Sequence, residues 1–189
     1  MILTGGTSRR MGRDKASLQF GDQTVLDFIL HFVPSGIPTV IVGEETSHAA
    51  IHVRENPPGG GPVAGIESAL SQIFTKYLYV IAVDTPFGLP WLLEQNPQPS
   101  VQAVIPRDSQ GRPHYLCAIY ETDALRHAMA DLGASANASM RDMIANISTV
   151  EYVDAPCTSA LTTHEILLDV NTPEDLETAQ AIRNRIWPD

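Results

Sequence analysis

Apolar positions along this chain follow two spacings, one typical of buried strands and one typical of amphipathic helices. Short continuous apolar runs predict strands, whereas apolar residues three and four positions apart predict helices. The strand-like runs lie at residues 1–4, 39–43, 77–83, 101–106, 114–120 and 166–170. The helix-like segments lie at residues 23–33, 63–74, 122–132 and 171–186, with a weaker one at 140–147.

Two of these segments allow sharper predictions. Residues 77–83, YLYVIAV, form the longest continuous run of β-type residues, so we expect a central strand of a parallel sheet. The helical segment at 63–74 places one apolar face toward the core. That face comprises Val63, Ile66, Leu70, Ile73 and Phe74.

The alternation of strands and helices predicts an α/β fold. We expect a three-layer, Rossmann-like sandwich in which a mostly parallel central sheet has helices on both faces. The 189 residues contain no repeat and no long linker, so we treat 1–189 as a single domain. Ligands of such sheets bind beyond the C-terminal strand ends. The loops of interest are therefore 5–15, 55–62, 84–90, 107–113 and 169–173.

Composition and charge narrow the class of protein. Apolar residues make up 43% of the chain and charged residues 18%, which is typical of a folded globular protein. No apolar run approaches the roughly 20 residues that cross a bilayer. Arg9 and Arg10 also stand where a signal peptide needs apolar residues, so we expect a cytoplasmic protein. The net charge of -10 argues against nucleic acids and anionic membranes as partners.

The cysteines and two of the histidines give no pattern of their own. Cys117 and Cys157 lie too far apart for a zinc spacing or a disulfide framework. Cys117 is interpreted as a small buried apolar residue. His48 and His52 are four positions apart, but their segment is more typical of a strand than of a helical metal site.

One glycine-containing loop holds much of the positive charge. A third of the twelve basic residues fall within seven positions of it, namely Arg9, Arg10, Arg13 and Lys15. Gly5 and Gly6 precede them, and glycines let backbone N–H groups approach a phosphate closely. We expect Arg9, Arg10 and Lys15 to neutralise a triphosphate. The loop matches neither a P-loop nor a dinucleotide motif, and the alternative is a solvated surface loop.

Asp84 follows the longest strand-like run. A carboxylate at such a strand end can hold Mg²⁺, which often takes one or two carboxylates together with substrate phosphates. The alternative is an Asx-turn ahead of Pro86. The nearby basic glycine loop favours the metal interpretation.

Two further loops offer candidate ligand groups. Gly59 to Gly61 could bring backbone groups against a flat base, or could be a plain connector. Asp169 and Asn171 place polar side chains at a predicted strand end. Residues 172–174 are also typical of a simple helix start, so both interpretations stay open here.

Five motifs, in order, resemble those of one enzyme family. Residues 3–18, LTGGTSRRMGRDKASL, resemble the signature of GT-A-like nucleotidyltransferases, and most of all the molybdenum cofactor guanylyltransferase family. The later motifs are GGGPVAGIESAL at 59–70, VDTPF at 83–87, GRPHYLCAIY at 111–120 and DVNTPEDL at 169–176. The family usually has a G-x-x-Q-P-L core in the fourth of these. The resemblance covers nearly the whole chain.

The resemblance implies a reaction and its partners. GMP would pass from GTP to the terminal phosphate of molybdopterin or the molybdenum cofactor, with Mg²⁺ as cofactor. The products would be the guanine dinucleotide cofactor and pyrophosphate. Molybdoenzymes or their chaperones would then receive the product. The oligomeric state is not implied.

The resemblance also implies roles for individual residues. Lys15, Asp84 and Arg10 would be catalytic, and Asp84 would bind the metal. Asp169 and Asn171 would lie on the pterin side. The nucleotide would be bordered by Leu3, Thr4, Gly5, Gly6, Arg9, Lys15, Glu55, Asn56, Gly61 and Asp84.

The chain departs from the family pattern at a few positions. Thr4 replaces an alanine, Thr85 replaces a methionine, and His114 stands near the usual glutamine. The acidic residue on the guanine side is either Glu55 or displaced to Asn56, and these two assignments stay open.

Two other functions fit parts of the same pattern. One is a CTP-dependent molybdopterin cytidylyltransferase, or a transferase that uses another nucleotide. Gly5 and Gly6 favour GTP, because cytidylyl relatives tend to carry Ala-Gly there. The other is a non-catalytic nucleotide-binding module, which the joint presence of Lys15 and Asp84 disfavours.

Overall fold

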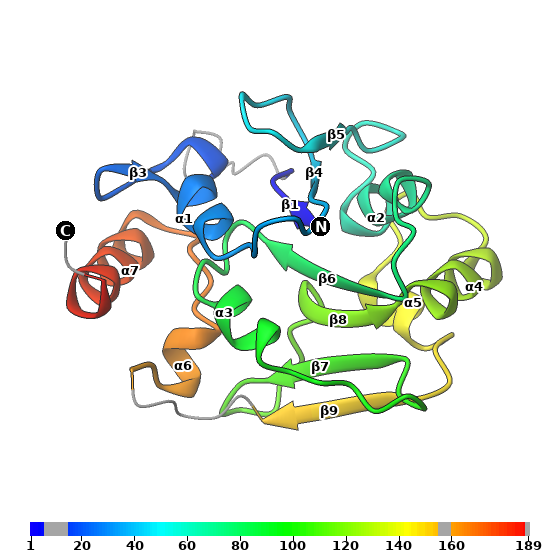
Figure 1. The fold of residues 1–189 in the computed structure, drawn as a ribbon. Helices are drawn as coiled ribbons and strands as arrows, with labels where there is room; N and C mark the ends of the chain where they lie inside the picture. The colour runs from blue at the N-terminus through cyan, green and yellow to red at the C-terminus, as the bar shows by residue number, and fades with distance from the viewer. Residues whose placement is uncertain (6–14, 155–159, 188–189) are drawn as a thin grey trace.

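The computed structural model describes residues 1–5, 15–154 and 160–187 (Figure 1). Within these residues, a seven-stranded sheet has the order β5-β4-β1-β6-β8-β7-β9, and a small separate hairpin pairs β2 with β3. The strands are β1 (Ile2–Leu3), β2 (Gln19–Phe20), β3 (Gln23–Thr24), β4 (Val40–Val42), β5 (Ile51–Val53), β6 (Tyr77–Ala82), β7 (Ala103–Arg107), β8 (Cys117–Glu121) and β9 (Val150–Asp154).

The large sheet is mostly parallel, as the sequence predicts. Strands β5, β4, β1 and β6 run in one direction, and β7 pairs with β9 in parallel. Strand β8 is antiparallel to both β6 and β7. The expected central strand, β6, therefore has a parallel neighbour on one side and an antiparallel neighbour on the other.

Helices cover both faces of the sheet (Figure 1). One core cluster packs under α1 (Val25–His31), α3 (Gly88–Leu93), α6 (Thr163–Ile166) and α7 (Pro173–Ile186). The other packs under α2 (Pro62–Leu70), α4 (Thr122–Leu132) and α5 (Met140–Ile144). The expected three-layer architecture is confirmed.

Three helices begin at threonine capping boxes. In each of them the threonine side chain accepts the backbone N–H three residues later, and the acidic residue at that position bonds back to the cap. The pairs are Thr24 with Asp27 in α1, Thr162 with Glu165 in α6 and Thr172 with Asp175 in α7. The helix start at Thr172 agrees with the sequence prediction.

The strand predicted at residues 166–170 is wrong. The capping box at Thr162 begins α6, which runs through Ile166. The chain then crosses to the end of β6, where the Val170 N–H donates to the Asp84 carbonyl oxygen at 2.7 Å. This bond fastens the segment to the sheet edge without adding a strand.

The helix predicted over 63–74 ends earlier than expected. It stops at Leu70, and Phe74 is 88% exposed instead of lying on the buried face. The Arg126 guanidinium donates to the carbonyl oxygens of Leu70 and Ile73 at 3.2 and 2.5 Å. These bonds satisfy carbonyl groups at the helix end while the chain turns toward β6.

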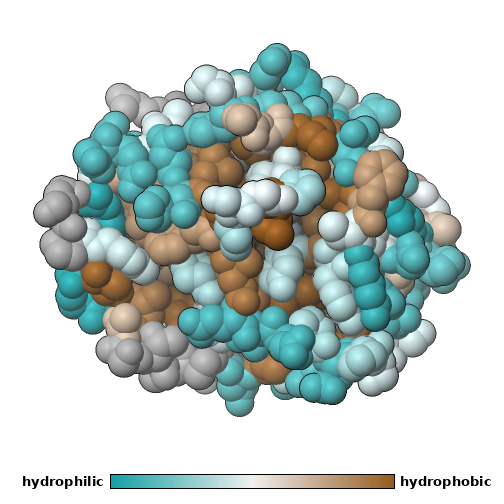
Figure 2. Space-filling model, viewed as in Figure 1, coloured by the Kyte–Doolittle hydropathy of each residue, from teal (hydrophilic) through white to brown (hydrophobic). Residues whose placement is uncertain are grey.

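The surface shows the usual division of side chains. In the view of Figure 2, hydrophilic residues dominate the rim of the face, and apolar residues show in its middle. Among the helices that the structure describes, none has the length and apolar character needed to cross a membrane.

Candidate functional site

Several loops meet at one edge of the sheet. Leu3 of β1 lies beside Val42 of β4 and Ala82 of β6, and Val42 lies beside Val53 of β5. The loops after these four strands therefore leave the sheet at the same edge. Strand β8 runs the opposite way, so the segment that leads into Cys117 lies at this edge too.

Lys15 joins the loop after β1 to the loop after β6 and to the segment that precedes α7. Its Nζ donates to Asp84 Oδ2 at 3.0 Å and to Asn171 Oδ1 at 2.6 Å. The Lys15 side chain is 14% exposed and that of Asp84 is 29% exposed. The three residues therefore form one partly buried polar cluster, although they come from three distant parts of the sequence.

The surroundings of Asp84 bear on its two interpretations. Among the hydrogen bonds between described residues, its carboxylate bonds to Lys15 and not to the backbone of its own turn. An Asx-turn requires such a backbone bond, so the geometry does not support that alternative. The role of Asp84 as a metal ligand stays a prediction.

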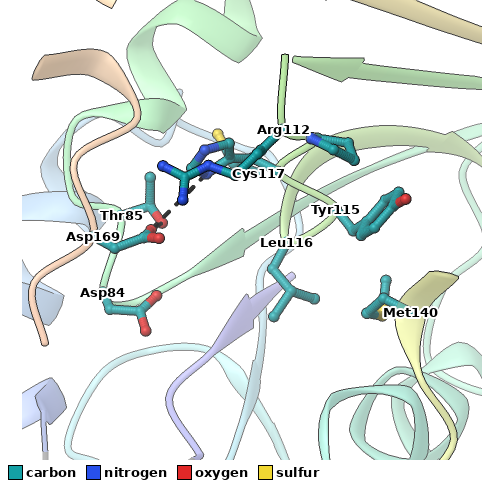
Figure 3. Close-up of a pocket in the computed structure, with 10 residues that line it drawn as sticks. Asp84, Thr85, Arg112, Tyr115, Leu116, Cys117, Met140 and Asp169 are labelled. Atoms are coloured by element: carbon teal, nitrogen blue, oxygen red, sulfur yellow. Dashed lines mark hydrogen bonds and ion pairs between the residues drawn. The ribbon is translucent and has the colours of Figure 1, made fainter. Parts of the chain in front are cut away.

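Asp169 places a second carboxylate next to the first. Its Oδ1 accepts the Thr85 hydroxyl at 2.9 Å and lies 4.0 Å from His114 Nδ1. Partial desolvation and then the negative charge of Asp84 raise the pKa of Asp169, against the opposing effects of Thr85, His114 and Lys15. Both carboxylates line the pocket shown in Figure 3.

This pocket has a volume of about 440 Å³. Its lining residues are Asp84, Thr85, Arg112, Pro113, His114, Tyr115, Leu116, Cys117, Met140 and Asp169. In Figure 3 the carboxylates and Thr85 lie on one side, and Tyr115 and Met140 lie on the other. The pocket therefore has an acidic side and a more apolar side.

Arg112 brings a cation to the pocket. Asp108 fixes the turn that carries it, accepting the backbone N–H groups of Gln110 and Arg112 at 2.8 and 2.9 Å and Arg112 Nε at 2.8 Å. Burial alone would raise the pKa of Asp108, but the hydrogen bonds from Arg112 and Gln110 outweigh it and lower that pKa. The Arg112 side chain stays 70% exposed and extends over the acidic side of the pocket (Figure 3).

Cys117 is buried, as expected, with 1% of its surface exposed. Burial, followed by the charge of Asp169, raises the pKa of the Cys117 thiol far above its usual range. A buried thiol with a raised pKa is a poor nucleophile, which agrees with the interpretation of Cys117 as a small buried residue.

The first strand gives the site backbone groups more than side chains. The Leu3 side chain packs in the core, and the Thr4 hydroxyl donates to the Val42 carbonyl oxygen at 3.0 Å. Gly43 makes room for Thr4, because a Cβ at position 43 would overlap the Thr4 Oγ1. Gly5 is exposed, and no atom of the described residues would lie within 4 Å of a Cβ at this position. A nucleotide at this strand end would therefore meet backbone atoms.

The predicted guanine side lies farther along the same edge. Glu55 Oε1 accepts the Gly59 N–H at 2.8 Å, and the Asn56 N–H donates to Ser68 Oγ at 3.0 Å. Gly61, with φ of 88°, precedes the first residue of α2. Strand β5 lies three positions from β6, which is about 14 Å at the usual strand spacing. None of the contacts between described residues joins Glu55 or Asn56 to the Lys15 cluster.

The remaining predictions concern residues 6–14, which lie outside the described part of the chain. These are the predictions that Gly6, Arg9 and Arg10 contact the nucleotide. Conversely, the sequence pattern predicts no role for Arg112 or Tyr115, although both line the pocket. The available signal was their place in the GRPHYLCAIY motif and in the loop that precedes β8.

Comparisons with known proteins agree with this architecture. A family model described as "MobA-like NTP transferase domain" matches residues 1–151. A protein of Mycobacterium avium named "Probable molybdenum cofactor guanylyltransferase" is 31% identical, covering 93% of this chain and 91% of the relative. A protein of the same name from Pelotomaculum thermopropionicum is 32% identical, covering 99% and 96%.

Two solved structures show the same fold. Molybdopterin-guanine dinucleotide biosynthesis protein A from Archaeoglobus fulgidus has a TM-score of 0.77 at 22% identity, covering 97% of each chain. The 2-C-methyl-D-erythritol 4-phosphate cytidylyltransferase from Thermus thermophilus has a TM-score of 0.68 at 19% identity, also covering 97% of each chain. The family predicted from the five motifs is confirmed by the family model and the curated relatives. This chain belongs to the MobA-like NTP transferase family and is a nucleotidyltransferase.

Proposed function

We propose that this nucleotidyltransferase transfers GMP from GTP to the terminal phosphate of molybdopterin or the molybdenum cofactor. The observation that carries the proposal is the Lys15 cluster, in which Nζ bonds both Asp84 and Asn171 beside an open pocket. Relatives that share about a third of their residues with this chain bear the guanylyltransferase name.

The nucleotide would lie along the sheet edge. Its phosphates would face Lys15 and the backbone at Gly5, and its base would lie toward the loop of Glu55 and Gly61. The spacing of about 14 Å between the ends of β5 and β6 suits a nucleoside triphosphate in an extended form. The acceptor would then occupy the pocket beside Asp169 and Arg112.

The residues of the pocket fit Mg²⁺. Asp84 and Asp169 both line it, and the charge of Asp84 raises the pKa of Asp169. A divalent cation would relieve that repulsion. Within the described residues, no three His, Cys, Asp or Glu side chains form a complete metal site. Mg²⁺ commonly completes its coordination with water and substrate phosphates, so Asp84 would hold it with Asp169 beside it.

The reaction needs positioning more than proton transfer. An oxygen of the acceptor phosphate forms a bond to the α-phosphorus of GTP, and the bond from that phosphorus to the bridging oxygen breaks, releasing pyrophosphate. Since the nucleophile is already an anion, no strong general base is required. A metal ion held by Asp84 would supply positive charge that offsets the repulsion between the two phosphate groups.

The chain's own residues orient and neutralise the reactants. Lys15 is held in place by Asp84 and Asn171, so its ammonium group is preorganised for the charge on the departing pyrophosphate. Arg112 is positioned by Asp108 and would meet the acceptor phosphate. Each group thus faces one of the two reactants.

A nucleotide comparison tests the proposal. The protein is incubated with molybdopterin and Mg²⁺, and pyrophosphate release is measured with GTP, CTP, ATP or UTP. We expect release with GTP that depends on molybdopterin, together with a dinucleotide product seen by mass spectrometry. A clear preference for CTP would make the protein a cytidylyltransferase, and no release with any nucleotide would overturn the proposal.

A further inference from the structure

A second hollow adjoins the pocket of Figure 3. It has a volume of about 870 Å³, and Pro113 and Tyr115 line both spaces. The short helix α5 also contributes to both, with Met140 lining the first pocket and Arg141 the second hollow. In Figure 3 the ring of Tyr115 lies on the side away from Asp84. The two spaces therefore share one wall.

The second hollow is cationic and aromatic. The Arg107 guanidinium lies 4.2 Å from the ring centroid of Tyr152, and Arg141 lines the same space. Among the ion pairs between described residues, none includes either arginine. In a chain of net charge -10, two arginines without a carboxylate partner indicate a place for an external anion.

Tyr115 lies within electrostatic reach of Tyr152, Arg141 and Arg107. Burial and then Tyr152 raise the pKa of Tyr115, while the charges of Arg141 and Arg107 act against that rise. Tyr152 stands on β9, the outermost strand of the sheet at that side. Its side chain is 37% exposed. Its ring is therefore available to a ligand.

We propose that this second hollow receives the ring end of the acceptor, a planar heteroaromatic group with anionic substituents. The inference rests on the proposed function. With its phosphate beside Asp169 and Arg112, the acceptor would extend past the shared wall of Pro113 and Tyr115. Aromatic faces and arginine planes stack on flat heterocycles, and Arg107 would pair with negative charge.

Three of these four residues lie outside the motifs that carry the family resemblance, and the fourth, Tyr115, lies within one of them. Arg107, Arg141 and Tyr152 fall between the motifs, and Tyr115 stands where the family usually has proline. The hollow is thus a feature through which this chain sets its own preference among acceptors.

Steady-state kinetics test the proposal with Arg107→Gln, Arg141→Gln and Tyr152→Leu. Losing one stacking face costs roughly a tenfold loss in binding, so we expect the acceptor KM to rise about tenfold while the GTP KM changes less than twofold. Lys76→Gln is the matched control, because Lys76 Nζ lies 5.0 Å from the Tyr77 ring at the start of β6, away from both spaces. An unchanged acceptor KM in all three variants, or an equal rise in the GTP KM, would overturn the inference.

A binding experiment separates this inference from the proposed function. Pterin-6-carboxylate, a planar ring with one carboxylate, is titrated into the wild-type protein without nucleotide, and quenching of its fluorescence is followed. We expect saturable binding that weakens about tenfold in the Arg107→Gln/Arg141→Gln double variant. Binding without any GTP-dependent transfer would refute the proposed function alone. Normal transfer with no ring binding would refute the inference alone.

Folding of each variant is checked by its thermal unfolding midpoint. Arg141 is exposed on α5, so Arg141→Gln is expected to keep the wild-type midpoint. If Tyr152→Leu fails to fold, the acceptor KM of Arg141→Gln decides the test.

Discussion

Lys15, at one end of the candidate nucleotide site, is held by residues 69 and 156 positions away in the sequence. Glu55, at the other end, bonds a backbone N–H only four positions away. The side chains of the proposed phosphate end are thus brought together by the tertiary fold, whereas Glu55 at the proposed base end is bonded within its own loop. Changes at the first end should therefore alter catalysis, and changes at the second should alter the choice of nucleotide.

The largest effect is expected for Asp84→Asn. The substitution keeps the size of the side chain and an acceptor for Lys15, but it removes the charge that would hold the metal. Because a metal ion contributes several kcal/mol to charge stabilisation, we expect kcat/KM to fall by about 10³-fold or more. Pyrophosphate release measured over a range of Mg²⁺ concentrations checks this. Wild-type activity with the same Mg²⁺ dependence would remove Asp84 from the metal site.

Lys15→Ala should come next. It removes the cation that Asp84 and Asn171 hold in place, so we expect kcat/KM to fall roughly 10²–10³-fold, the scale for losing one preorganised donor. The measurement is steady-state pyrophosphate release at saturating acceptor. Lys76→Ala makes the same change of charge far from the site and should keep normal turnover, and a normal rate in Lys15→Ala itself would contradict the role.

A smaller and more selective effect is expected for Glu55→Gln at the base end. Glutamine retains an oxygen for the Gly59 N–H but lacks the charge that would strengthen hydrogen bonds from guanine. We expect the GTP KM to rise about tenfold and the CTP KM to stay constant. Competition between the two nucleotides measures this. An equal change for both would assign Glu55 to loop structure alone.

The two ends also differ in how far the sequence predicts them. Asp84 stands directly after one strand-like run, and Lys15 ends the loop that follows another. The strand ends of a parallel sheet meet at one edge. Lys15 and Asp84 could therefore be expected to lie together. The hydrogen bond from Lys15 to Asn171 depends in addition on α6 and on the crossing segment at 167–170, which the apolar pattern wrongly predicts as a strand.

Other features could not be predicted from the sequence for a related reason. The apolar run 166–170 is short enough to suit either a strand or a buried crossing segment, and periodicity alone does not decide between them. Strand β9 has the sequence VEYVD, with exposed charged residues, so it lacked the apolar run that marks a buried strand. Arg112 depends on the local turn that Asp108 fixes, and an irregular turn of this kind has no periodic signal.

The smallest effect is one of stability, and it concerns Asp169, which borders the phosphate end. The folded protein raises the pKa of Asp169 above its ordinary value, first by desolvation and then by the charge of Asp84. The native state therefore binds this proton more tightly than the unfolded chain does. The resulting stabilisation is fully present below the unfolded-state pKa of about 3.9. It is lost as the pH rises through the folded-state value.

Asp169→Asn removes the desolvated negative charge that repels Asp84. It keeps an oxygen that can accept the Thr85 hydroxyl. At pH 7 the variant should unfold at a higher temperature than the wild type, by no more than about 2–4 °C. The side chain is 46% exposed, so solvent screens most of the repulsion. The difference should vanish near pH 3.5, below the ordinary pKa of about 3.9. Asp131→Asn, on the exposed surface of α4, should show no such dependence.

An Asp169→Asn variant less stable than wild type at both pH values would show that the carboxylate stabilises the fold. It would also weaken the case for two like charges kept together to bind a cation.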